Sequence, residues 1–124
     1  MDFSNNKAIY LQIAEYVCEH ILLGKWKPQD KIPSVRELAV DMEVNPNTVM
    51  RTYELLQKQN IITNKRGIGF FLAQDAIANV NIYRKTTFIE DELPQLFRNM
   101  YLLEIDFEEL KNRYQTFVTE NFNA

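Results

Sequence analysis

The chain has 124 residues, of which 46% are apolar, with three glycines, four prolines and one cysteine. This composition is ordinary for one helix-rich domain, alone or with a helical appendage. A single cysteine excludes an internal disulfide, and no apolar run is long enough to predict a signal peptide or a membrane span, so we expect a cytoplasmic protein. The net charge of −3 is unevenly spread, because residues 45–70 hold four basic residues and one acidic residue, whereas residues 75–124 hold five and nine.

The first predicted helix runs from about Lys7 to Leu23, and Gly24 ends it. Its apolar residues recur at helical spacing: Tyr10, Ile13, Ala14, Val17, Cys18 and Ile21. Cys18 lies in this stripe, so we expect a buried, inert thiol. His20 is the only histidine, so zinc binding or general-base chemistry would lack a partner.

Two helix start signals follow the connector in which Trp26 is expected to anchor the chain to the core. Ser34 is followed three residues later by Glu37, a capping box that satisfies two free amides at a helix start. Asn45 followed by Pro46 is a second start, because Asn caps a helix and Pro suits its first position. Helices separated by so few residues predict a helix-turn-helix.

The second of these helices is predicted to have one polar and one apolar side. At about 100° per residue, Asn47, Thr48 and Arg51 fall on the polar side. The opposite side carries Val49, Tyr53 and Leu56. An amide, a hydroxyl and a guanidinium suit base edges and phosphates in a major groove. The alternative is an ordinary solvated helix surface.

A hairpin with a basic turn is predicted from Ile61 to Leu72, with the turn at 64–67 and Gly69 just beyond it. Glycine allows a tight turn and the close approach of another surface. A basic hairpin directly after a helix-turn-helix indicates the wing of a winged helix, whose tip reaches the DNA groove. The alternative is a hairpin that only closes the domain, with Lys65 and Arg66 solvated.

The rest of the chain is predicted to be helical from about Asp75, either as one kinked helix or two, with a final helix capped by Asp106. These helices are apolar on one side and rich in Phe, Tyr, Leu and Met, but they are too few to bury that side by themselves, so they pack on the winged helix or pair with a second copy. We favour pairing, because two-fold symmetry matches a palindromic operator. The residues expected at this dimer interface are Leu96, Phe97, Met100, Leu103, Phe107, Tyr114 and Phe117.

Taken together, the motifs IYLQI, GKWKPQDKIPSVREL, NPNTVMRTYELL and RGIGFFL resemble the DNA-binding domain of the GntR family of bacterial regulators. The VNPNTV stretch and the short tail resemble its YtrA-type subfamily. The resemblance implies a mainly α fold with a small β-hairpin wing. Residues 1–73 would form a winged helix-turn-helix DNA-binding domain, and residues 74–124 a short helical dimerisation tail.

The resemblance also implies which residues contact DNA: an arginine in the first helix-turn-helix helix, the start of the second helix, and the wing. In this sequence the expected DNA-binding residues are Ser34, Arg36, Asn45, Pro46, Asn47, Thr48, Arg51, Lys65, Arg66, Gly67 and Ile68. Many GntR proteins have arginine where this chain has Pro46 and Met50, so those two arginine contacts are not carried over. Arg51, one position on, is the expected substitute.

We therefore expect a homodimeric transcription regulator, in particular a repressor, that binds a double-stranded, inverted-repeat operator. No enzyme is predicted, because the sequence offers no nucleophile and base pair, no metal-ligand spacing and no phosphate-binding loop, and we expect neither a cofactor nor a metal. The tail is too short for a separate ligand-binding domain, and the sequence predicts no particular effector. The alternative is a protein-interaction module, with the winged helix as scaffold and the aromatic-rich tail binding a different protein.

Overall fold

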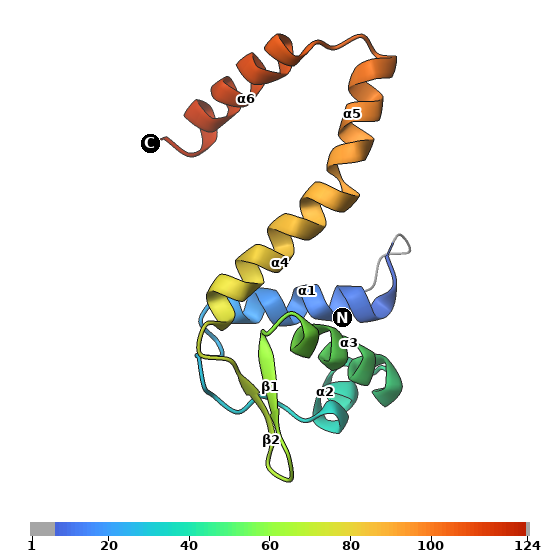
Figure 1. Cartoon of the computed structure of the whole chain (residues 1–124), viewed down its shortest axis with the longest axis vertical. Coiled ribbons are helices and arrows are strands. Elements are labelled where there is room, and N and C mark those ends of the chain that lie inside the picture. The colour runs from blue at the N-terminus through green and yellow to red at the C-terminus, as the bar shows by residue number, and fades with distance from the viewer. Residues whose placement is uncertain (1–6, 124) are drawn as a thin grey trace. The chain divides into compact units, whose positions relative to one another are not determined.

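The computed structural model describes residues 7–123, which form six helices and a two-stranded antiparallel hairpin (Figure 1). The elements are α1 (Ile9–Leu22), α2 (Val35–Met42), α3 (Pro46–Lys58), β1 (Ile62–Lys65), β2 (Gly69–Leu72), α4 (Ala76–Asp91), α5 (Leu93–Leu102) and α6 (Phe107–Asn121). The chain divides into two compact units, one ending at Arg84 and one beginning at Lys85. The predicted fold class, mainly helical with a small hairpin, is confirmed.

The core of the first unit is built around α1. Five of the six residues in its predicted stripe are buried, Cys18 among them as expected, whereas Tyr10 is only half-buried. The helix begins two residues later than predicted, and it ends before Gly24, whose φ of +75° is the left-handed conformation that glycine adopts without strain. Trp26 packs against this core from the connector, as predicted.

Both predicted caps of the helix-turn-helix are confirmed. At the start of α2 the Ser34 hydroxyl accepts from the Glu37 amide at 3.1 Å, and the Glu37 carboxylate accepts from the Ser34 amide at 3.0 Å. At the start of α3 the Asn45 side chain accepts from the Asn47 amide at 2.7 Å. Leu55 lies on the polar side of α3 by helical angle alone, yet it packs half-buried against the core.

The hairpin is held to the helices by the two buried residues at its base and by one aromatic ring of β2. Ile62 pairs with Leu72, and both side chains are buried. Phe70 makes an edge-to-face contact with the Tyr53 ring of α3, with the ring centroids 4.9 Å apart. The turn is shorter than predicted, because β1 continues to Lys65 and only residues 66–68 connect the strands. Residues 30–32 run along β2, where the Ile32 amide donates to the Phe70 carbonyl.

The first turns of α4 belong to the core of the first unit. Ala76 and Val80 are fully buried there, and the Asn79 side-chain amide donates to the Asn60 carbonyl at 2.8 Å. The compact unit thus continues beyond residue 73, to Arg84. The functional division expected at that point, DNA binding before it and dimerisation after it, stays a prediction.

The second unit contains the end of α4, then α5 and α6. The stretch left open in the sequence as one kinked helix or two is two, because α4 ends at Asp91 and α5 begins at Leu93 with Pro94 in its first turn. The predicted cap of α6 is confirmed, since the Asp106 carboxylate accepts from the Glu109 amide at 2.8 Å. No residue of α6 is buried.

Candidate nucleic-acid interface

The first turn of α3 presents polar groups to solvent. Asn45, Pro46 and Asn47 are exposed, and Thr48 is half-buried. The Asn45 side chain is used for the cap, so it fixes the direction of the helix, whereas the Asn47 side chain makes no hydrogen bond within residues 7–123. On the other side of the helix Val49, Tyr53 and Leu56 are buried, as predicted. The start of α3 is therefore held rigidly while its polar side stays open to a ligand.

Arg36 lies in the first turn of α2, one residue after the first residue of the helix, and is exposed. It forms neither an ion pair nor a hydrogen bond with another described residue. Its neighbour Glu37 is engaged in the capping box, and the hydrogen bond from the Ser34 amide lowers the pKa of its carboxyl group. Ser34 is exposed as well but already occupied by the cap, so Arg36 is the charged group of this turn that stays free to bind a ligand.

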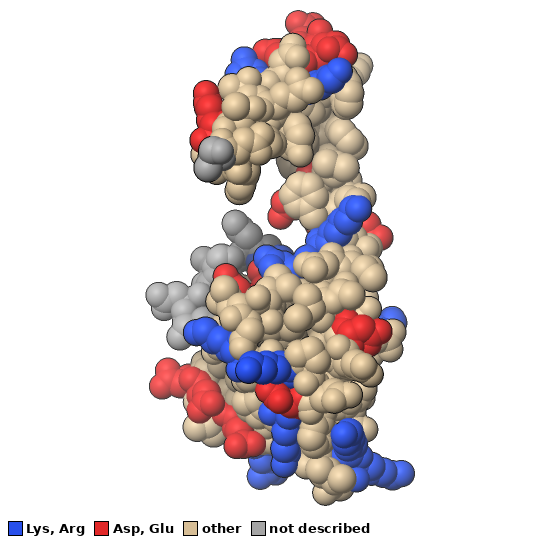
Figure 2. Space-filling view, turned by 90° about the vertical axis from the view of Figure 1, so that its left-hand side faces the viewer, with Lys and Arg blue, Asp and Glu red and all other residues tan. Residues whose placement is uncertain are grey.

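The tip of the wing is basic and exposed at residues 65–68. Gly67 has a φ of +78°, and the Ile68 amide donates to the Lys65 carbonyl at 2.9 Å, which closes the turn. The side chain of Ile68 is 61% exposed. In Figure 2 blue side chains occupy the lower end of the first unit, where Figure 1 shows the wing tip. Such a tip suits contact with phosphates or a groove.

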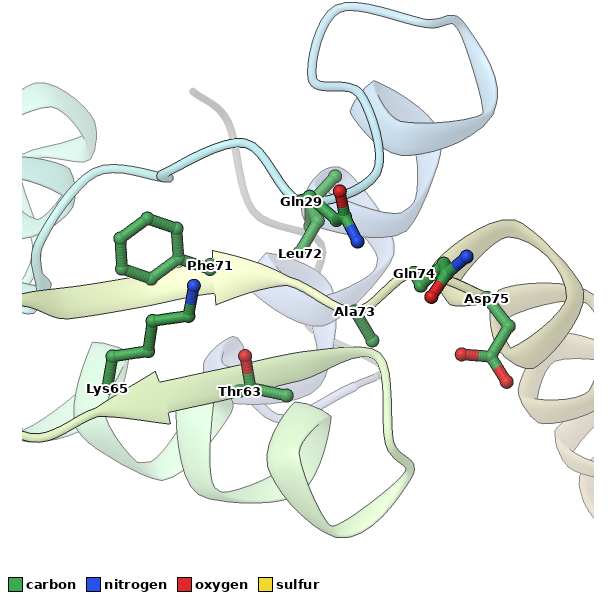
Figure 3. A pocket seen from close by; sticks show the side chains of 8 residues that line it. All are labelled: Gln29, Thr63, Lys65, Phe71, Leu72, Ala73, Gln74 and Asp75. Atoms are coloured by element: carbon green, nitrogen blue, oxygen red, sulfur yellow. The ribbon is translucent and has the colours of Figure 1, made fainter.

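A shallow pocket of about 560 Å³ lies at the base of the wing, and the sequence did not predict it (Figure 3). It is lined by Gln29, Thr63, Lys65, Phe71, Leu72, Ala73, Gln74 and Asp75. The ammonium group of Lys65 lies 4.2 Å from the centre of the Phe71 ring on the opposite strand. Gly69 nearby has a φ of +140°, which side-chain-bearing residues rarely adopt, and a Cβ there would displace only the flexible end of Lys31, 2.9 Å away. Lys65 thus covers one ring of the wing, and Lys31 packs on the backbone of β2.

Arg51 does not stand free on α3 as its helical angle suggests. Its guanidinium carbon lies 3.8 Å from the centre of the Tyr10 ring, which belongs to α1. The sequence places Tyr10 only in the apolar stripe of α1, and helical spacing within one helix gives no signal for a contact between two helices. The expected DNA-binding residues thus come together in three groups on the first unit: the start of α2, one side of α3, and the wing tip.

The tail residues expected at a dimer interface are largely exposed. Six of the seven have more than a third of their surface open, whereas Met100 is only 9% exposed and belongs to the interior. The exposed six are Leu96, Phe97, Leu103, Phe107, Tyr114 and Phe117. The sequence prediction missed further exposed apolar residues on α4, namely Ile77, Ile82, Phe88 and Ile89. These four residues do not share one helical spacing, so the sequence does not reveal that they remain open.

The single histidine packs against aromatic rings, and the described residues form no metal site. His20 lies between the tilted rings of Tyr16 and Trp26, with centroids 4.2 and 5.1 Å away, and partial burial lowers its pKa. Within residues 7–123, no three His, Cys, Asp or Glu side chains are grouped closely enough to hold a metal ion. None of the described helices has the length and apolar character needed to cross a membrane.

We expect Cys18 to resist alkylation in the folded protein. Burial raises its pKa to about 11, so at pH 8 little thiolate is present, and the side chain is inaccessible. Iodoacetamide labelling followed by mass spectrometry should be slower by about a hundredfold or more in buffer than in guanidinium chloride. Equal rates under both conditions would show that Cys18 is not in a packed core.

A helix-turn-helix followed by a hairpin, with a basic tip and an exposed polar helix start, defines a winged-helix DNA-binding protein. The sequence model of bacterial regulatory proteins of the gntR family matches residues 9–72. This chain belongs to the GntR family. It is a transcriptional regulator with a DNA-binding domain, in a family whose regulators are not enzymes.

Relatives that match most of the chain support this assignment. The HTH-type transcriptional regulator YhcF of Bacillus subtilis is 36% identical over 115 residues, covering 93% of each chain. The HTH-type transcriptional repressor YtrA of the same organism is 36% identical over 110 residues, covering 89% of this chain and 84% of YtrA. A GntR-family regulator from Bacteroides thetaiotaomicron has a crystal structure that superposes with a TM-score of 0.77 at 48% identity, covering 91% of this chain and 98% of that one. The similarity therefore includes the helical tail.

Proposed function

We propose that the protein is a cytoplasmic repressor that binds an inverted-repeat operator as a homodimer. The observation that carries the proposal is the pairing of an open, capped helix start on α3 with an exposed basic wing in one unit. The similarity to YtrA, which is named a repressor, supports the direction of regulation. A gel-shift titration with genomic fragments against a like-charged competitor tests sequence-specific binding and separates it from a role as a protein-interaction scaffold.

The proposed contacts divide into two kinds. Arg36 and the wing residues Lys65 and Arg66 position the protein through phosphates, since their charges are exposed at the start of α2 and on the wing tip. Asn47 and Thr48 sit in the first turn of α3, the part of a recognition helix that reaches base edges. Arg51 lies one turn further along and completes the base-reading side. Asn45 and Pro46 set the helix start, and Gly67 and Ile68 complete the wing tip.

Dimerisation through the tail is supported by its exposed apolar side chains. Phe107, Tyr114 and Phe117 of α6 each expose more than half of their surface. Leu96, Phe97 and Leu103 of the same unit are exposed as well, and a large exposed apolar patch marks an interaction site in a protein. A second copy of the same tail would cover it symmetrically and would hold two DNA-binding units together.

Arg36→Ala should weaken operator binding by about 1–3 kcal/mol and leave the melting temperature nearly unchanged. The side chain is exposed, and no described residue pairs with it, so folding is little affected when it is removed. Fluorescence anisotropy at fixed salt gives the dissociation constant. Arg84→Ala, an exposed arginine outside the proposed face, is the matched control. Equal affinities for wild type and Arg36→Ala would remove Arg36 from the interface.

Substitutions on α3 and on the wing should have different signatures. Asn47→Ala or Thr48→Ala should change which operator sequences are preferred, because these groups reach base edges. Lys65→Ala or Arg66→Ala should instead reduce the slope of log K against log salt by about one unit for each phosphate that is no longer neutralised. Selection from a random library and salt titrations measure the two quantities. Identical sequence preferences for wild type and Asn47→Ala would refute the assignment of Asn47 as a base reader.

A further inference from the structure

Two consecutive residues of α3 contact the same residue of α1. The guanidinium carbon of Arg51 lies 3.8 Å from the centre of the Tyr10 ring. The hydroxyl of Thr52, which is fully buried, donates to the backbone carbonyl of Tyr10 at 2.8 Å. The position of the Tyr10 backbone is thus fixed by a buried hydrogen bond from the very turn of α3 that carries Arg51. The two helices therefore hold the Tyr10 ring and the Arg51 side chain in register with each other.

The stacked arrangement leaves the hydrogen-bonding edge of Arg51 available. A guanidinium stacks through its flat face, so its N–H donors, which lie in the plane, still point outward. Within residues 7–123 no acceptor binds them, and the ion pairs formed there, Lys7 with Glu15 and Arg113 with Glu109, do not involve Arg51. The aromatic ring is therefore the group that orients this side chain before DNA arrives.

We propose that Tyr10 is a positioning residue for DNA binding, which holds the Arg51 guanidinium in the plane that a bidentate contact to DNA requires. The inference rests on the proposed function and deepens it. An arginine on a helix surface normally loses rotamer freedom when it binds, and stacking on Tyr10 removes part of that freedom in advance. Tyr10 itself need not touch DNA, and its hydroxyl is not required, because the ring provides the stacking surface.

A double-mutant cycle tests this role, with a DNA duplex that the wild-type protein selects from genomic fragments as the probe. Tyr10→Leu should raise the dissociation constant for the whole duplex, with both half-sites together, by about three- to tenfold. Tyr10→Phe should keep the dissociation constant within about twofold of the wild-type value. In an Arg51→Ala background, Tyr10→Leu should have no further effect, because the side chain it positions is gone. The same decrease in affinity from Tyr10→Leu in both backgrounds would overturn the proposal.

Arg51→Lys provides a second test that leaves Tyr10 intact. It keeps the charge but removes the planar group, so we expect affinity to fall nearly as far as it does in Arg51→Ala. Wild-type affinity for Arg51→Lys would overturn the proposal even if Tyr10→Leu failed to fold, which circular dichroism and the melting temperature would show. If wild type selects no duplex over competitor, the proposed function itself fails. If wild type does select one and Tyr10→Leu binds it equally well, only the role of Tyr10 fails.

Discussion

A chain that ends after Arg84 is expected to stay folded and monomeric, and to bind the operator about 10²–10⁴-fold more weakly than the full chain. The first compact unit ends at this residue, so its core remains complete. The cut removes the exposed apolar residues of α5 and α6 that we propose hold two copies together. Without that link the second half-site contact is no longer intramolecular, which accounts for the size of the expected decrease.

Light scattering and fluorescence anisotropy on the two chains would measure both parts of this prediction. A full chain that is monomeric at micromolar concentration, or a shortened chain that binds equally well, would contradict it. A cut after Ala73 is the informative control, because it also removes Val80 and Ala76 from the core and the hydrogen bond from Asn79 to Asn60. That shorter chain should melt at a clearly lower temperature than the chain ending at Arg84.

Tyr53→Ala should destabilise the first unit by about 3–5 kcal/mol, the usual cost of removing a large aromatic side chain from a core. Tyr53 is fully buried in α3 and contacts Phe70 of the wing. Its hydroxyl donates to the Pro33 carbonyl just before α2, at 2.6 Å. Burial raises the pKa of the phenol above its ordinary value, so the group stays a neutral donor at working pH. One side chain thus links both helices of the helix-turn-helix to the hairpin.

Tyr53→Phe separates the hydrogen bond from the packing. It keeps the ring but leaves the Pro33 carbonyl without its donor, which should cost about 1–3 kcal/mol. Urea unfolding followed by circular dichroism gives both values. DNA binding should disappear in Tyr53→Ala at temperatures where the variant is unfolded and persist in Tyr53→Phe. A Tyr53→Ala variant as stable as wild type would show that the three elements do not depend on this side chain.

Local signals in the sequence are sufficient to predict the start of each helix in the helix-turn-helix. The Ser34–Glu37 capping box and the Asn45–Pro46 start are set by residues close together in the chain, and both are present in the structure. The apolar stripe of α1 and the hairpin are predictable from periodicity for the same reason. These features need no knowledge of the tertiary packing.

Contacts between distant segments could not be predicted in this way. The stacking of Arg51 on Tyr10 joins residues 41 positions apart, and no periodic pattern encodes it. The docking of Val80 on the winged-helix core also depends on where α4 leaves the hairpin, so the compact unit extends further than residue 73. Met100 shares the helical spacing of exposed neighbours on α5 but is buried, because spacing does not show which side of a helix its own unit covers.

The most direct test of the central claim is a footprint of the full-length protein on genomic DNA, followed by anisotropy on the protected sequence. The account predicts an inverted repeat whose half-site centres lie about 34 Å apart or a small multiple of that, bound by two copies of the chain. Protection of a single asymmetric half-site by one copy, or no preference over like-charged competitor DNA, would contradict it.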